Sequence, residues 1–315
     1  GWINQCIEEV DNQTTKAKGK IVFKGPCDLM GLTSYLKADN LICELTYISD
    51  TRHNNLEHQG CMTNYLQIPT LTEADIRYLV DDLIFNDEKL FSTSIYDNDA
   101  KLIFISSLQE FHFGIYRHRT KGYKICFGEW NHPMTDTNEW EGYIHNKVWT
   151  SSNKFTREFL EGFSKDWEFV GRKSYDEYEA EVRQFMEMVA SDAHVCIFLG
   201  SEIPYEGETP DAWQDRHIVH KEVNDRLRRI AKEFPRLHLI DYTDFITSNK
   251  DYTDSIDHFQ RYVHYKIAQS ANNIIEDVLG EKIQQSGKMK IYKNQFRDFL
   301  TSIHIALIDF KKKLK

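Results

Sequence analysis

Short apolar runs alternate along this chain with longer segments in which apolar residues recur every three or four positions. The short runs predict strands and the longer segments predict helices. We expect strands at 20–24, 41–48, 101–106, 195–199 and 237–240. We expect helices at 29–36, 73–83, 175–190, 217–234 and 261–279. Alternation of this kind is typical of βαβ units, so the pattern predicts a three-layer α/β/α sandwich, flavodoxin-like in plan, around a mainly parallel sheet.

Three regions stand apart from this alternation. Residues 111–169 are rich in aromatic residues and histidine with few regular periodicities. We expect either an irregular insertion or lid near the substrate, or a long ordered excursion packed on the sheet edge. The pattern at 281–315 predicts an amphipathic C-terminal helix with a basic end. The basic residues either complement the helix dipole or dock the helix on a membrane surface or a partner domain. Residues 1–19 are polar and begin with Gly rather than Met, so we expect a linker and a domain cut from a longer polypeptide. The α/β domain itself is expected to span 20–280.

Composition and charge narrow the class of protein. The 315 residues are enough for one large α/β domain, and 28% charged residues indicate a soluble surface. The net charge of −10 argues against nucleic-acid binding, which needs a basic face. The six cysteines show neither a CxxC pair nor metal-ligand spacing, so no metal is expected. Cys43 and Cys196 lie in apolar runs and are expected to be buried thiols.

The same features bear on localisation. No apolar window is long enough to predict a transmembrane helix. With unpaired cysteines and no visible signal peptide, the sequence predicts a cytoplasmic protein. The basic C-terminal segment leaves open a position at the inner face of the membrane.

Cys27 is the first candidate for chemistry. It follows the strand 20–24 across Gly25 and Pro26, and Asp28 and a predicted helix come directly after it. A thiol at a strand-to-helix turn gains from unpaired backbone N–H groups, which favour the thiolate. Gly25 permits the tight turn. The alternative explanation is that a small residue fills a crowded turn.

His258 is the second candidate. It comes just before the last predicted helix of the α/β domain, and Asp254 and Asp257 flank it. A carboxylate that orients an imidazole is the logic of an acid–base triad, and the sequence leaves open which aspartate has this role. The alternative is an ordinary helix-capping stretch. Together, Cys27 and His258 predict a nucleophile–base pair assembled by the sheet.

Polar residues follow several of the predicted strands. In a parallel sheet, ligands collect outside the carboxyl ends of the strands, so these residues are expected to border the substrate or to supply oxyanion donors. The candidates are Gly25, Asp28, Arg52, His53, Ser106, Ser107, Gly200, Ser201 and Glu202. Arg261, three residues after His258 at the start of a predicted helix, is a further candidate for binding the substrate.

These blocks resemble the SGNH/GDSL hydrolase-like superfamily over residues 20–280. The family's first block is strand-Gly-Asp-Ser, and here the strand ends in Gly25-Pro26-Cys27. Its last block is Asp-x-x-His and a helix with a small residue ten positions after the histidine, which matches His258 and Ala268. The run from His258 through Phe259 and Arg261 to Tyr265 looks like versions in bacterial polysaccharide-modifying members. Two departures stand out: Ser255 occupies the place of the family's aspartate, and no Gly-x-Asn-Asp block supplies the oxyanion hole.

The resemblance implies a function. Cysteine in the serine position is similar to a branch from capsule and cell-surface glycan loci, described as acyl or other group transferases. It implies transfer of an acyl group, acetyl first among them, to a sugar hydroxyl of a bacterial surface or capsular polysaccharide. The donor implied is acetyl-CoA, with no tightly bound cofactor, and the partner is a glycan or a sugar-nucleotide-derived substrate. The alternatives are an esterase or other group transferase on the same scaffold, or a non-catalytic glycan-binding or scaffold domain of a larger capsule-assembly enzyme.

Overall fold

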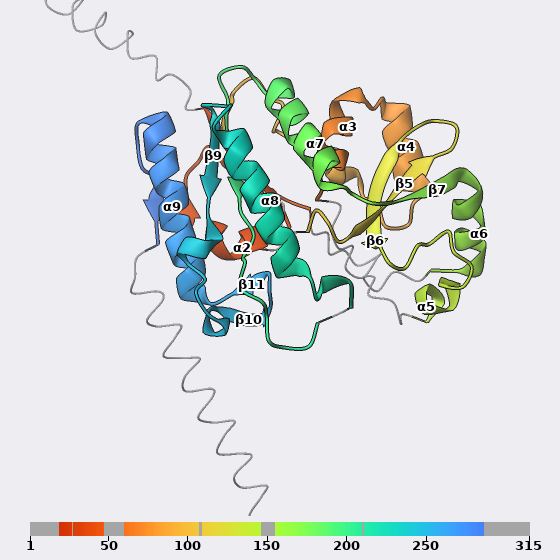
Figure 1. The fold of residues 1–315 in the computed structure, drawn as a ribbon. Helices are drawn as coiled ribbons and strands as arrows, with labels where there is room; N and C mark the ends of the chain where they lie inside the picture. The colour runs from red at the N-terminus through yellow and green to blue at the C-terminus, as the bar shows by residue number, and fades with distance from the viewer. Residues whose placement is uncertain are drawn as a thin grey trace, which may run out of the picture.

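A five-stranded parallel sheet forms the centre of the molecule (Figure 1). The computed structural model describes residues 19–26, 28–46, 60–106, 109–145, 155–209 and 211–286. The strands of the sheet are β1 (Lys20–Gly25), β3 (Leu41–Leu45), β4 (Ala100–Ser106), β8 (His194–Phe198) and β9 (Leu237–Ile240). Each lies where the apolar runs predicted a strand. The prediction of a mixed α/β fold with a parallel central sheet is therefore confirmed.

Helices cover both faces of this sheet. Successive strand residues point to opposite faces, so Phe23 enters one core cluster and its neighbour Val22 enters another. The first cluster includes α2 (Asp28–Thr33) and α9 (Arg261–Leu279). The second includes α3 (Met62–Gln67), α7 (Tyr175–Met188) and α8 (Arg216–Ala231). The inner strands β1, β4 and β8 are buried on both faces, which explains why they read as continuous apolar runs.

The strand order marks a place for a site. The strands of this sheet lie in the order β3-β1-β4-β8-β9. Strand β3, which follows β1 in the chain within this sheet, lies on one side of β1, and the later strands lie on the other side. The order therefore reverses between β1 and β4. In open α/β sheets of this kind, ligands bind outside the carboxyl ends of the strands at such a reversal. Gly25 ends β1 and Ser106 ends β4 at this point.

Of the two alternatives for 111–169, the described residues form the ordered excursion and not an irregular insertion. This region contributes β5 (Phe113–His118), β6 (Lys124–Glu129) and β7 (Trp167–Arg172) to an antiparallel sheet of order β6-β5-β7. Helices α5 (Trp140–Ile144) and α6 (Arg157–Asp166) accompany it, beside the parallel sheet in Figure 1. Most residues of β5 and β6 are buried, so the alternation that would have predicted strands is absent from the sequence.

The antiparallel sheet has a hydrophobic core of its own. Phe127 and Trp167 from this sheet pack with Leu79 of α4 (Glu73–Asp81) and with Phe85. Phe85 and Phe127 stack with ring centroids 3.9 Å apart. The chain therefore buries its aromatic-rich region in a second core rather than exposing it.

Short elements complete the described fold. They are β2 (Leu36–Lys37) paired with β12 (Gln284–Gln285), the hairpin of β10 (Tyr252–Ser255) and β11 (His258–Phe259), and the 3₁₀ helices η1 (Ile68–Thr70), η2 (Glu88–Leu90), η3 (Asp211–Trp213), η4 (Tyr242–Asp244) and η5 (Asn249–Asp251). The helix predicted at 29–36 ends at Thr33, because Leu36 pairs with β12. Residues 281–286, predicted to open the C-terminal helix, instead include β12; residues 287–315, like 1–18, lie outside the described part.

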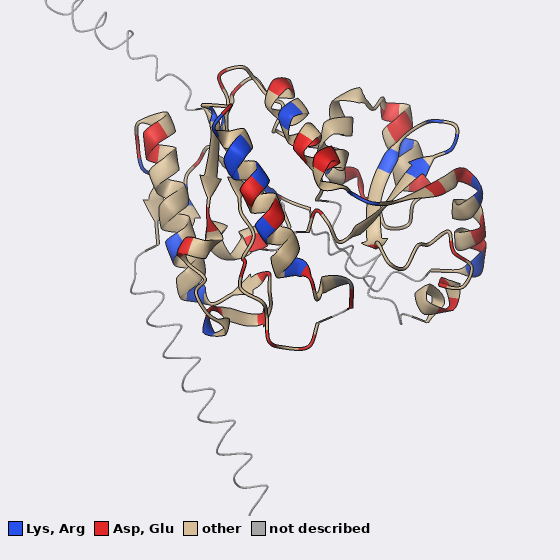
Figure 2. Cartoon of the chain, viewed as in Figure 1, with Lys and Arg blue, Asp and Glu red and all other residues tan. Residues whose placement is uncertain are grey.

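Two further sequence expectations can be compared with the structure. Cys196 is buried as predicted, but Cys43 is exposed, because it lies on β3 at the edge of the sheet. None of the helices in the described ranges is long and apolar enough to cross a bilayer. Acidic and basic side chains are interspersed along α8 rather than gathered by sign (Figure 2).

Candidate functional site

Asp28 occupies the point where the strand order reverses. It opens α2 directly beyond β1 and is only 3% exposed. Its Oδ2 accepts a hydrogen bond from the Ser106 hydroxyl at 2.7 Å and lies 3.5 Å from the Tyr242 hydroxyl, whereas its Oδ1 is buried with no side-chain partner among the described residues. Burial raises the pKa of Asp28 to about 7, with the charge of Asp257 adding to the rise and the Ser106 hydrogen bond opposing it. This carboxyl group can therefore hold a proton near neutral pH.

Gly25 lets β1 and β4 approach closely at the same place. A Cβ on Gly25 would lie 2.8 Å from the Cβ of Ser106, closer than real carbon atoms pack. Its carbonyl accepts a hydrogen bond from the Thr46 N–H at 2.9 Å, just beyond β3. The predicted tight turn thus has a physical basis in the missing side chain.

His258 lies on the β10–β11 hairpin and contacts Asp254. The Asp254 Oδ1 atom lies 2.7 Å from His258 Nδ1, and the histidine side chain is 46% exposed. Burial would raise the pKa of Asp254, but hydrogen bonds from His258 and Thr253 outweigh it and lower the pKa. Of the two aspartates that the sequence left open, Asp254 is the one that meets the imidazole.

Asp257 has a different partner. Its Oδ2 forms an ion pair with Arg216, the first residue of α8, and these side chains are only 5% and 1% exposed. The guanidinium group of Arg216 also lies over the Trp213 ring, 4.9 Å from its centroid. Sequence reasoning missed Arg216, because an arginine at a helix start ordinarily indicates a solvent-exposed position.

The loop after β8 uses its polar groups within the fold. The Gly200 N–H donates to Asn224 Oδ1 at 2.9 Å, and the Asn224 amide donates back to the Gly200 carbonyl at 2.8 Å. Ser201 Oγ lies 2.5 Å from the Tyr252 hydroxyl. Glu202 accepts hydrogen bonds from Asn224 and from Arg228. The three predicted residues therefore lie where expected, at the carboxyl end of β8. Their hydrogen bonds join this end of β8 to α8 and to the β10–β11 hairpin.

The remaining predicted residues divide into two groups. Arg261 is the first residue of α9, near enough to Tyr35 that its charge opposes the burial that raises the tyrosine's pKa. Four lie outside the described residues: Cys27, Arg52, His53 and Ser107. The neighbours of Cys27 are described, and the Leu29 N–H donates to the Pro26 carbonyl at 3.2 Å.

His264 links the hairpin region to the start of α2. The Cβ position that Gly31 lacks is 2.5 Å from the His264 ring, so α9 packs closely on α2 here. Burial, together with the charge of His258, lowers the pKa of His264 to about 4. The ring of Phe259, next to His258 in the hairpin, lies 5.5 Å from the His264 ring, so the hairpin packs beside the α2–α9 contact.

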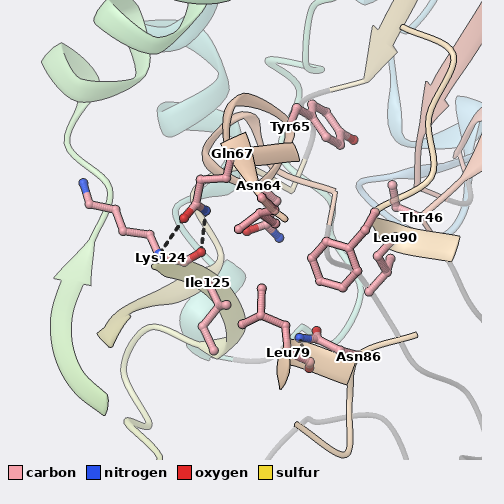
Figure 3. A pocket seen from close by; sticks show the side chains of 11 residues that line it. Thr46, Asn64, Tyr65, Gln67, Leu79, Asn86, Leu90, Lys124 and Ile125 are labelled. Atoms are coloured by element: carbon pink, nitrogen blue, oxygen red, sulfur yellow. Dashed lines mark hydrogen bonds between the residues drawn. The ribbon is translucent and has the colours of Figure 1, made fainter. Parts of the chain in front are cut away.

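A small pocket lies between α3, α4 and β6 (Figure 3). Two hydrogen bonds between the Gln67 side chain and the Lys124 backbone, at 2.7 and 2.5 Å, join α3 to β6 at its wall. The cavity volume is about 20 Å³, which is room for one or two waters. Its lining includes neither Asp28 nor His258, and its volume is too small for an acyl donor or a sugar, so it is not the predicted site.

Tyr242 was also missed, although a signal existed. It follows strand β9 by two positions, and the same rule about strand carboxyl ends would have selected it.

No group of three or more His, Cys, Asp or Glu side chains that could hold a metal ion is found in the described ranges.

Comparisons of the sequence found no matching protein-family model and no matching curated protein.

Proposed function

We propose that this protein is an acyltransferase that transfers an acyl group, acetyl foremost, to a sugar hydroxyl of a bacterial surface or capsular polysaccharide. The proposal adopts the SGNH-like resemblance for the parallel-sheet domain. In it, Cys27 is the nucleophile, His258 is the base and Asp254 orients the base. The observation that carries it is the hydrogen-bonded Asp254–His258 pair on a hairpin beside α2, the helix that begins one residue after Cys27.

The chemistry follows from which nitrogen of the imidazole carries the proton. Because Asp254 accepts from Nδ1–H, the neutral ring carries its lone pair on Nε2. Nε2 would take the thiol proton of Cys27, and the thiolate would attack the thioester carbonyl of acetyl-CoA. The CoA thiolate leaves and takes the proton back from His258, which leaves an acetyl thioester on Cys27. The sugar hydroxyl then gives its proton to His258 and displaces Cys27, so one hard transfer becomes two easier steps.

The Ser106–Asp28 contact supports this placement. A buried carboxyl group that shares a hydrogen bond with the end of the neighbouring strand is costly to maintain, and such groups concentrate at functional sites. Asp28, which carries this carboxyl group, comes directly after Cys27 in the chain.

A non-catalytic glycan-binding or scaffold domain is the second candidate. Two observations favour it: Ser255 replaces the aspartate of the family pattern, and the polar groups of Gly200 and Glu202 are engaged within the fold. In that case Cys27 would form no covalent intermediate.

Intact-mass analysis after incubation with acetyl-CoA separates the two candidates. We expect one acetyl group on Cys27 in the wild type and in Cys43→Ala, a control that removes an exposed thiol, and none in Cys27→Ala. His258→Gln should slow acetylation by about 10²- to 10⁴-fold. His145→Gln is its matched control, because His145 also pairs with an acid four residues away, Glu141, at 3.3 Å.

The outcomes are decisive for the assignment. A wild-type protein that never carries an acetyl group, or a His258→Gln variant that acetylates at the wild-type rate, would refute the proposal. Release of free acetate without sugar acetylation would instead identify an esterase on the same scaffold.

A further inference from the structure

The hairpin that carries His258 has little backbone pairing of its own. Only two residue pairs join its strands, Tyr252 with Phe259 and Ser255 with His258, and the register shifts between them. Two-stranded hairpins are marginally stable without packing. The position of the imidazole therefore depends on what anchors the hairpin to the rest of the fold.

Asp257 provides a charged anchor at the turn. Its side chain is buried, whereas that of the next residue, His258, is half exposed. Because Asp257 lies in the turn directly before His258, holding Asp257 inward limits the directions open to the imidazole. A fixed Asp257 thereby fixes the direction in which the imidazole meets Asp254.

Arg216 holds Asp257 from a distant helix. The ion pair joins α8 to the hairpin, and both side chains are almost fully buried. The Trp213 ring packs against the guanidinium group and limits its freedom. Arginine suits this role because its rigid, planar donor group orients a carboxylate better than the flexible ammonium of lysine.

We propose that Arg216 is a positioning residue: its ion pair with Asp257 holds the hairpin so that His258 stays hydrogen-bonded to Asp254 and aimed at the substrate. The catalytic part of this inference rests on the proposed function, in which His258 is the base. The structural part concerns only the Asp254–His258 contact and can be measured without any activity.

The test uses a variant that removes both charges together. Arg216→Met alone would leave Asp257 buried without its cation, which destabilises a fold strongly. Arg216→Met/Asp257→Asn removes the ion pair while keeping similar side-chain volumes. Arg216→Lys keeps the cation and serves as the conservative rescue. Arg226→Met is the control, since Arg226 lies on the same helix but forms its ion pairs with Asp176 and Glu179 of α7 and with Glu222 of α8 itself.

The first measurement is the pKa of Asp254, followed by carboxyl ¹³C NMR. In the double variant we expect this pKa to rise toward the ordinary value of an aspartate, because the hydrogen bond from His258 is lost. In Arg226→Met it should stay lowered as in the wild type, and in Arg216→Lys it should stay largely lowered. A folded double variant with an unchanged Asp254 pKa would overturn the positioning role.

The second measurement is the rate of acetyl transfer. Misplacing a catalytic group by about 1 Å can cost about 10²-fold, so we expect kcat of the double variant to fall 10- to 100-fold with little change in KM. If no variant or wild-type protein transfers acetyl but the Asp254 pKa moves as expected, the proposed function fails and the positioning of His258 stands. A fall in kcat without a change in that pKa would place the effect elsewhere and overturn the inference.

Discussion

Asp28→Asn offers the sharpest test of how this fold treats a buried carboxyl group. The substitution keeps the shape of the side chain and an oxygen that can accept the Ser106 hydrogen bond, but it removes the ability to ionise. A carboxyl group whose pKa is higher in the folded than in the unfolded chain binds its proton more tightly when folded. Its contribution to stability is therefore present at low pH and is lost as the pH rises from the unfolded pKa to the folded pKa.

The magnitude follows from the two pKa values. The ordinary value is 3.8 and burial raises it to about 7. Each pH unit between them is worth about 1.4 kcal/mol, so the full window corresponds to about 4 kcal/mol. Roughly 2.5 kcal/mol of this falls between pH 5 and pH 8. The free energy of unfolding of Asp28→Asn, relative to that of the wild type, should rise by this amount over that interval.

Urea unfolding at pH 5 and pH 8 measures this difference directly, because other titrating groups cancel between wild type and variant. Ser106→Ala provides a second comparison. Its hydrogen bond lowers the pKa of Asp28, so removing it should move the loss of stability to higher pH. A wild-type-to-variant difference that is the same at both pH values would refute the reasoning, since it would mean that Asp28 is ionised across the range.

Three further predictions concern packing and burial. Gly25→Val should lower the free energy of unfolding by about 1–3 kcal/mol, measured in urea, because its side chain would collide with Ser106; an equally stable variant would contradict the close approach of β1 and β4. Lys173→Met should cost about 3–5 kcal/mol in the same assay, since it leaves Glu110 buried without its cation, and a loss below about 1 kcal/mol would argue against that burial. Maleimide labelling of the native protein, mapped by mass spectrometry, should modify the exposed thiol of Cys43. It should spare the buried thiols until urea is added, and these are Cys61, Cys126 and Cys196. Labelling of a buried thiol before urea is added would contradict its burial.

The sequence by itself determined the parallel sheet and most of the helices that cover it, α3 being the exception. Strands buried on both faces must be apolar throughout, and helices that cover them must be apolar on one side, so both leave a local pattern. The strand predicted at 101–106 corresponds to Ala100–Ser106, and the helix predicted at 261–279 to Arg261–Leu279. The rule on strand carboxyl ends also selected Asp28 and Ser106, which the structure brings into contact.

Only the tertiary structure decided which side chains meet. Asp254 and Asp257 flank His258 alike in the sequence, and the hairpin geometry alone directs the first to the imidazole and the second to Arg216. The antiparallel sheet at 113–172 was hidden for a related reason, because its strands are buried mainly by packing partners elsewhere in the chain, including Leu79 and Phe85. Local periodicity records how deeply a segment is buried. It does not record which distant residue the segment is buried against, and the chemistry of this site depends on those distant pairings.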